Sequence, residues 1–146
     1  MRSSNEISGM VLKAARGAGM TLGCAEEFAR AAPYLASLGK LEVALDLLNE
    51  PFEMPAFQEG LLSGGHPVLA VICLSDLQAA GLDVRLEAKI SATLCDALSQ
   101  RSVPVGPFEV DPEVWDGLAL LAARILVPET EQSRLAGAGA GLSDND

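Results

Sequence analysis

The sequence predicts an α+β fold that is mainly helical, with an N-terminal unit of three helices followed by a small α/β part that holds one or two short strands. Two patterns support this. Apolar residues recur at steps of three and four through residues 1–50, whereas residues 84–91 alternate between apolar and polar side chains. A length of 146 residues indicates a single domain, and 49% hydrophobic with only 4% aromatic residues indicates a core of aliphatic side chains, which suits close helix packing.

The first helix is predicted to begin at Ser3 or Ser4, which can cap it, with Glu6 in its first turn. Glycines at positions 17 and 19 are predicted to end it. Its apolar face consists of Ile7, Val11, Ala14 and Ala15.

Thr21 is predicted to cap the second helix, which Gly39 ends, and Pro33 inside it predicts a kink or a break into two pieces. Its apolar positions are Cys24, Phe28, Ala31, Leu35 and Leu38. A short third helix is predicted from Leu41, and Pro51 ends it.

Residues 51–66 contain two prolines and three glycines and lack a usable period, so we expect a long loop that could act as a lid or an interface. Residues 67–80 fit either a buried strand or a helix. The length of the segment and the position of Pro67 at its start favour the helix.

Residues 84–91 are predicted to form a strand, with a competing helical stripe through residues 86, 90, 94 and 98. A second extended piece is expected at 102–110, where prolines restrict it to a sheet edge. Asp111, followed by proline and glutamate, predicts a closing helix that carries Trp115 and ends at Pro128. The α/β part thus covers 67–128, and a glycine-rich C-terminal segment covers 129–146.

The charge of the chain argues against nucleic acid and membrane surfaces as partners. Twenty acidic residues against ten basic ones give a net charge of −10, which repels phosphate groups. Residues 1–20 differ, because Arg2, Lys13 and Arg16 there face only Glu6, so a local anion site near the N-terminus stays open.

The three cysteines, Cys24, Cys73 and Cys95, are widely spaced and lie in apolar stretches, so we expect reduced, buried thiols and a cytoplasmic location. No signal-peptide pattern follows Met1. His66 is the only histidine, and without a nearby partner it predicts neither catalysis nor a metal site. We therefore expect no cofactor and no metal.

Two candidate sites lie near the N-terminus. Arg16, Gly17 and Gly19 precede the start of the second helix and could cradle a small anion, although a C-terminal cap is the better interpretation of an arginine and glycines at a helix end. Glu26 and Glu27 are paired carboxylates that could act as acid and base, but acidic residues also stabilise a helix start, and Glu26 could pair with an arginine four residues later.

The C-terminal stretch SRLAGAGAGLSDND contains two further candidate sites. Ser133, Arg134 and the glycines could form an anion-binding nest, or the stretch could be a solvated tail. Asp144 and Asp146 could bind a hard cation, but without the further ligands of a calcium loop a solvated acidic end is the better interpretation.

Stretches at both ends resemble an uncharacterised bacterial family known as domain of unknown function 3726. They are NEI at 5–7, KAARGAG at 13–19, GCAEE at 23–27 and VPETEQSRLAGAGAGLSDND at 127–146. The resemblance implies no activity. It does draw attention to Thr130 and Glu131 beside the residues named above, and it implies that residues 133–141 dock on the first two helices, with Arg134 facing Glu26 and Glu27 or Arg16 facing the terminal aspartates.

The sequence therefore predicts a non-catalytic cytoplasmic accessory or protein-interaction module that self-associates. The alternative is an enzyme that binds a small anionic metabolite between the RGAGMT turn, residues 16–21, and the C-terminal segment. A pocket of unpaired charges there would favour the enzyme, fully paired charges would favour the module, and a large exposed apolar patch would indicate a structural subunit.

Overall fold

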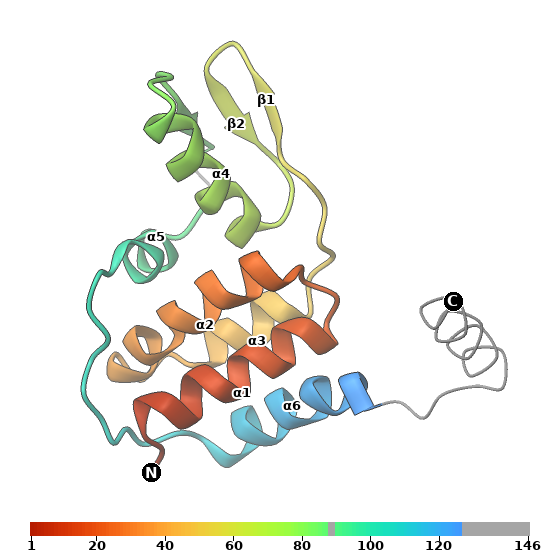
Figure 1. Ribbon diagram of the computed structural model, residues 1–146, viewed down its shortest axis with the longest axis vertical. Coiled ribbons are helices and arrows are strands. Elements are labelled where there is room, and N and C mark those ends of the chain that lie inside the picture. The colour runs from red at the N-terminus through yellow and green to blue at the C-terminus, as the bar shows by residue number, and fades with distance from the viewer. Residues whose placement is uncertain (88–89, 127–146) are drawn as a thin grey trace, which may run out of the picture.

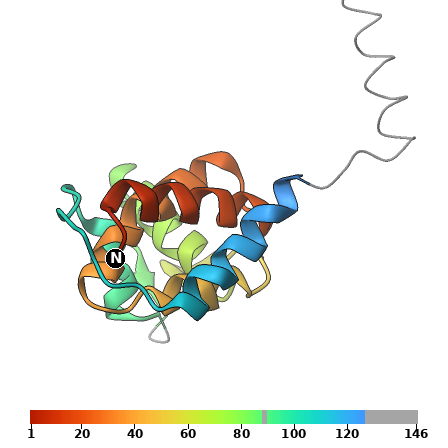
Figure 2. The ribbon, with the colours of Figure 1, turned by 90° about the horizontal axis from the view of Figure 1, so that it is seen from below.

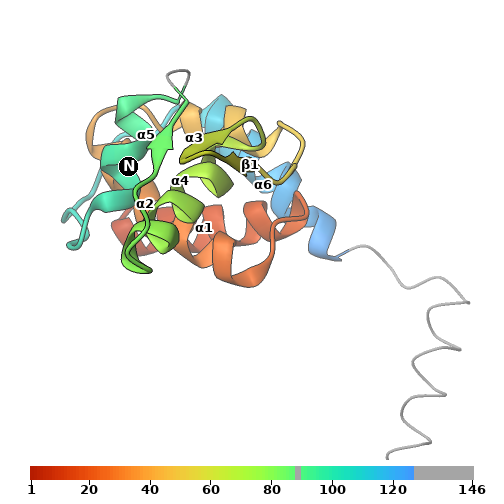
Figure 3. The ribbon, with the colours of Figure 1, turned by 90° about the horizontal axis from the view of Figure 1, so that it is seen from above.

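A computed structural model describes residues 1–87 and 90–126 of the chain and confirms a mainly helical α+β fold (Figure 1). The helices are α1 (Ser4–Gly17), α2 (Leu22–Ser37), α3 (Glu42–Leu48), α4 (Pro67–Ala79), α5 (Ala92–Ser99) and α6 (Pro112–Ala123), and a 3-10 turn, η1 (Arg124–Leu126), follows α6. The strands are β1 (Ala56–Gln58), β2 (Leu61–Ser63) and β3 (Arg85–Leu86). Helices α1, α2, α3 and α6 form a helical body, and α4, α5 and the strands lie on the far side of α2 from α6 (Figures 1 and 3).

Helix α1 begins as the sequence predicts, because Ser3 and Glu6 form a capping box. The Ser3 hydroxyl accepts a hydrogen bond from the Glu6 amide at 3.2 Å, and a Glu6 carboxylate oxygen accepts one from the Ser3 amide at 2.8 Å. The four predicted apolar residues of this helix are all buried. Helix α1 therefore begins at its predicted cap and packs its predicted apolar face into the core.

Helix α2 runs through Pro33 without interruption, so the predicted break is wrong. Proline removes one backbone hydrogen bond, but Pro33 is itself buried with Phe28 and Leu35 on either side of it, and that packing outweighs the loss. The buried stripe also differs from the prediction, because Cys24 is only half-buried and Leu38 is 47% exposed.

The predicted loop at 51–66 is in fact partly a β-hairpin, so that prediction is wrong. Strand β1 pairs with β2 in antiparallel fashion, with Phe57 opposite Leu62. The turn between them needs positive φ angles, which Glu59 and Gly60 adopt at 51° and 76°. Three-residue strands are too short to show a period in the sequence.

Strand β3 pairs in parallel with β2, which gives the sheet order β1-β2-β3. The predicted strand at 84–91 is confirmed only for Arg85 and Leu86, and residues 88–89 lie outside the described part of the chain. The sheet and α4 enclose a small second core of Leu62, Ala70 and Val84.

The remaining segments close the helical body. The competing helical stripe through residues 94 and 98 is realised as the separate helix α5. The expected extended piece at 102–110 pairs at Phe108 with Arg2, in an isolated antiparallel bridge. Asp111 caps α6 by accepting a hydrogen bond from the Glu113 amide at 2.8 Å, as the sequence predicts.

Helices α1 and α6 lie side by side, as the view from below shows (Figure 2). Gly17 makes this packing possible, since a Cβ atom at that position would stand 1.8 Å from the carbonyl oxygen of Leu121. The Arg2 guanidinium carbon lies 4.3 Å from the centre of the half-buried Trp115 ring, which joins the start of the chain to α6.

Candidate functional site

The RGAGMT turn has structural contacts that account for its residues. The Arg16 guanidinium donates a hydrogen bond to the carbonyl oxygen of Met20 at 3.2 Å, so it closes the turn in which it stands. Gly19 adopts a φ of 102°, which favours glycine, and Gly17 gives room to α6. These contacts agree with the C-terminal cap interpretation of the turn.

Glu26 and Glu27 are both exposed, and only one of them has an ion-pair partner in the described structure. Arg30 pairs with Glu27, at 2.9 Å between Nη2 and Oε2, and the predicted pairing with Glu26 is wrong. Arg30 also donates hydrogen bonds to the carbonyl oxygens of Leu98 at 3.3 Å and of Gln100. The arginine therefore ties α2 to the end of α5.

The C-terminal candidates, Thr130, Glu131, Ser133, Arg134, Asp144 and Asp146, lie outside the described residues. The predicted docking of this segment, with Arg134 facing Glu26 and Glu27 or with Arg16 facing the terminal aspartates, therefore stays a prediction.

His66 has a structural task that the sequence did not reveal. It is 1% exposed and caps α4, where Nδ1 accepts a hydrogen bond from the Val68 amide at 3.2 Å and Nε2 donates to the Leu47 carbonyl oxygen at 2.7 Å. The Phe52 ring lies 4.6 Å from the imidazole, centre to centre. The position of His66 in the sequence could have indicated this cap, because His66 directly precedes Pro67, the proline that begins α4.

The cysteines are free, as expected, but half-buried rather than buried. Burial, and after it the carboxylate of Asp76, raises the pKa of the Cys73 thiol. Burial and then Asp96 raise the pKa of the Cys95 thiol. Both thiols therefore stay protonated at neutral pH, where a thiol is a poor nucleophile. Among residues 1–87 and 90–126, no three histidine, cysteine or acidic side chains gather as metal ligands would.

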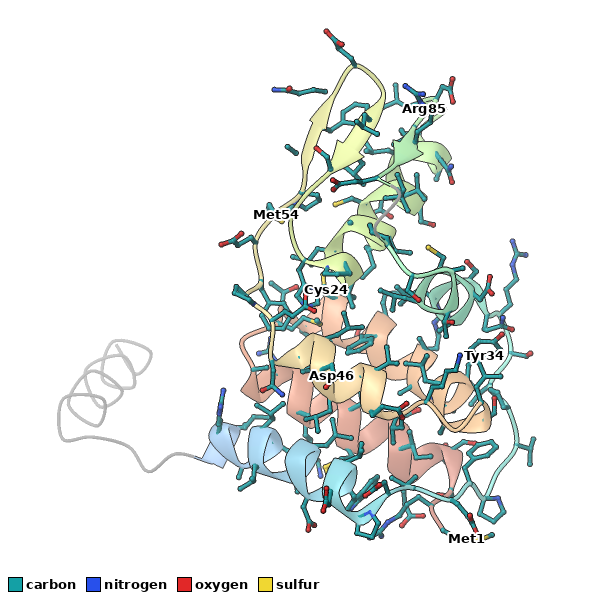
Figure 4. All side chains as sticks on the ribbon, turned by 180° about the vertical axis from the view of Figure 1, so that it is seen from behind. Met1, Cys24, Tyr34, Asp46, Met54 and Arg85 are labelled. Atoms are coloured by element: carbon teal, nitrogen blue, oxygen red, sulfur yellow. The ribbon has the colours of Figure 1, made fainter. Side chains whose placement is uncertain are left out.

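Two of the hollows formed by the described residues lie between helices and have room for a partner or a ligand. One, of about 390 Å³, lies between α1 and α6 and is lined by Met10, Lys13, Ala119, Ala122, Ala123 and Ile125. The other, also about 390 Å³, lies between α2, α4 and α5 and includes Glu27, Asp76 and Cys95 in its wall. Cys24 lies near the junction between the helical body and α4 (Figure 4). Sequence reasoning missed both hollows, because each joins elements that are distant in the chain.

The exposed face of α6 adjoins the first hollow. Leu120 is 73% exposed on this face, and Ile125 in the following turn is 51% exposed. Asp116 and Arg124 are exposed as well, four residues before and four residues after Leu120. An exposed leucine thus lies between opposite charges on one side of the helix.

A family model described as "Protein of unknown function (DUF3726)" matches residues 2–58, the segment that contains α1, α2, α3 and β1. The N-terminal half of the resemblance is therefore supported, while the C-terminal motif lies outside the match. No curated protein and no solved structure matches the chain significantly. Within the part of the chain that the structure describes, every helix is too short or too polar to cross a membrane.

Proposed function

We propose that the protein is a non-catalytic interaction module that self-associates through the exposed face of α6. The observation that carries this proposal is Leu120, a large apolar side chain that is 73% exposed on α6, the helix whose Ala119, Ala122 and Ala123 line the first hollow. A second copy would cover this surface and remove apolar area from water, which favours association. Self-association is a property that an interaction module and a structural subunit would share.

The face is complementary to itself, which is why we propose a second copy as the occupant. If two α6 helices pack antiparallel about a two-fold axis at Leu120, Asp116 of each copy comes opposite Arg124 of the other. Neither charge takes part in an ion pair within residues 1–87 and 90–126. Pairing of Asp116 with Arg124 across the axis would offset part of the repulsion between two chains of net charge −10.

The contacts of the other candidate residues support a non-catalytic role. Arg16 donates to Met20, Arg30 occupies Glu27, and both ring nitrogens of His66 are hydrogen-bonded. The net charge supports a protein partner over a nucleic acid, and the three free cysteines support a reducing compartment such as the cytoplasm.

Sedimentation velocity of the full chain over a range of concentrations tests the proposal. We expect a concentration-dependent dimer, and we expect Leu120→Lys to make the chain monomeric, because it places two like charges at the axis. Leu82→Lys is the matched control, since Leu82 is also exposed, at 48%, but lies outside α6. A wild-type chain that stays monomeric at every concentration would refute self-association.

A charge exchange tests the antiparallel arrangement. Arg124→Asp alone, or Asp116→Arg alone, replaces two attractive pairs by two repulsive ones and should weaken the dimer about tenfold or more. The double variant carrying both changes restores opposite charges across the axis, so its dissociation constant should return toward that of the wild type. A double variant as weak as the single ones would exclude this pairing.

A further inference from the structure

We propose that the hollow between α2, α4 and α5 binds a small organic cation with an apolar body. This site is separate from the α6 face and does not depend on self-association. Its volume of about 390 Å³ falls within the range typical of small-molecule pockets, about 300 to 1,000 Å³.

The hollow has an apolar part that can take the body of a ligand. Val71, Ile72 and Leu74 contribute from α4, and Leu98 contributes from α5. Since α4 and α5 also contribute to the core of the protein, this part of the wall stands on packed helices rather than on a loop. A flat aromatic or short aliphatic group would bury apolar surface here.

Among residues 1–87 and 90–126, the charged groups of the wall are negative. Glu27 and Asp76 line the hollow, and this described lining contains no lysine, arginine or histidine. Glu27 is already paired with Arg30, whose guanidinium also binds carbonyl oxygens at the end of α5, so Asp76 supplies the main attraction for a cation.

The end of α4 adds to this attraction. Asp76 and Gln78 stand in the last turn of α4, where the helix dipole is negative, and this turn has no basic residue to balance it. A bound cation would satisfy both the dipole and the carboxylate. An anion would meet repulsion from both, so the chemistry of this hollow differs from the anion site that the sequence suggested elsewhere.

Neutral polar groups near the carboxylates can orient an ammonium group, which has three N–H donors. The hydroxyl groups of Ser75 and Ser99 line the hollow, and Ser99 donates its proton to the Cys95 carbonyl oxygen at 2.6 Å, which leaves the hydroxyl oxygen able to accept. The Cys95 thiol is also in the wall, and its raised pKa keeps it neutral, so it adds no charge.

Titration of the full chain with phenethylammonium, followed by amide chemical shifts in NMR, tests the proposal, with hydrocinnamate as a probe of similar shape and opposite charge. We expect saturable shifts at Val71, Ile72 and Leu98 with the amine, at a dissociation constant on the order of millimolar for so small a ligand. We expect no saturation with the carboxylate. Equal binding of both probes, saturation mapped to another surface, or no saturable shift with the amine would overturn the proposal.

Two variants locate the interaction. Asp76→Asn should weaken amine binding about fivefold, because it removes one partly exposed ion pair, while Asp46→Asn, which makes the same change on α3 (Figure 4), should leave binding unchanged. Ser75→Phe fills the hollow from an exposed position and should abolish binding of the amine. Amine binding to Ser75→Phe at the wild-type affinity would place the site elsewhere.

Discussion

Replacing Gly17 by alanine should destabilise the protein, although alanine is normally the better helix former. A Cβ atom at Gly17 would lie 1.8 Å from the Leu121 carbonyl oxygen and 2.8 Å from its carbonyl carbon, both of them backbone atoms of α6. Helices α1 and α6 would have to separate by more than about 1 Å, which disturbs close packing along their whole contact. Overpacking of this kind costs about 1 to 3 kcal/mol or more, which exceeds the roughly 1 kcal/mol that alanine gains over glycine in a helix.

Thermal unfolding followed by circular dichroism measures the effect, and Gly9→Ala in the same helix is the matched control. Nothing lies within 4 Å of a Cβ atom at Gly9, so that change should raise stability by about 0.5 to 1 kcal/mol. A net loss of about 2 kcal/mol at Gly17 would lower the Tm by about 4 to 8 °C for a chain of this size. A Gly17→Ala variant that melts at or above the wild-type temperature would refute the conclusion that Gly17 is needed for the packing of α1 against α6. The RGAGMT turn would then again be a candidate anion site.

Three further outcomes are expected. In urea denaturation, His66→Ala should lose about 2 to 4 kcal/mol, because it leaves the buried Val68 amide without its partner, removes one donor to the Leu47 carbonyl oxygen and opens a cavity. His66→Asn should lose less, since asparagine can still cap α4. Hydrogen bonds from the Ser3 backbone amide, then from the Ser3 hydroxyl and then from Arg2 hold the pKa of Glu6 below its ordinary value of 4.5. The ionised carboxylate therefore stabilises the folded state above pH 4.5, and this stabilisation is lost as the pH falls through the lowered pKa. Glu6→Gln should therefore be less stable than the wild type at neutral pH, and the difference in urea midpoint should vanish in acid. Truncation after Pro128 should lower the Tm if residues 129–146 dock on α1 and α2, and an unchanged Tm would refute that docking.

The helix ends are the best-predicted part of the fold, because capping is a local interaction. Ser3 with Glu6, and Asp111 with its own following amides, make hydrogen bonds across two or three residues, so the sequence contains both partners. The predicted break at Pro33 is wrong, and the difference has the opposite origin, since the burial of Pro33 inside a continuous α2 depends on tertiary packing. The position of a proline in the sequence does not show how deeply that proline is buried in the folded protein.

The candidate sites were less predictable than the fold. Arg16 and Gly17 could be singled out by sequence, but their tasks depend on Met20 and on α6, and Gly17 lies more than a hundred residues before Leu121. Glu27, Asp76 and Cys95 all line the hollow between α2, α4 and α5. Their spacing in the sequence gives no indication that they lie close together. Long-range proximity of this kind arises only when the chain folds.

The mainly helical class, the starts of α1 and α6 and the free cysteines follow from the sequence alone, because periodicity, caps and residue counts are properties of neighbouring residues or of composition. Three features depend on long-range packing: His66 is a buried cap, residues 56–63 form a hairpin, and Leu120 is exposed between Asp116 and Arg124. A side chain's burial and partners depend on which distant segments pack beside it, and local patterns carry no information about that choice.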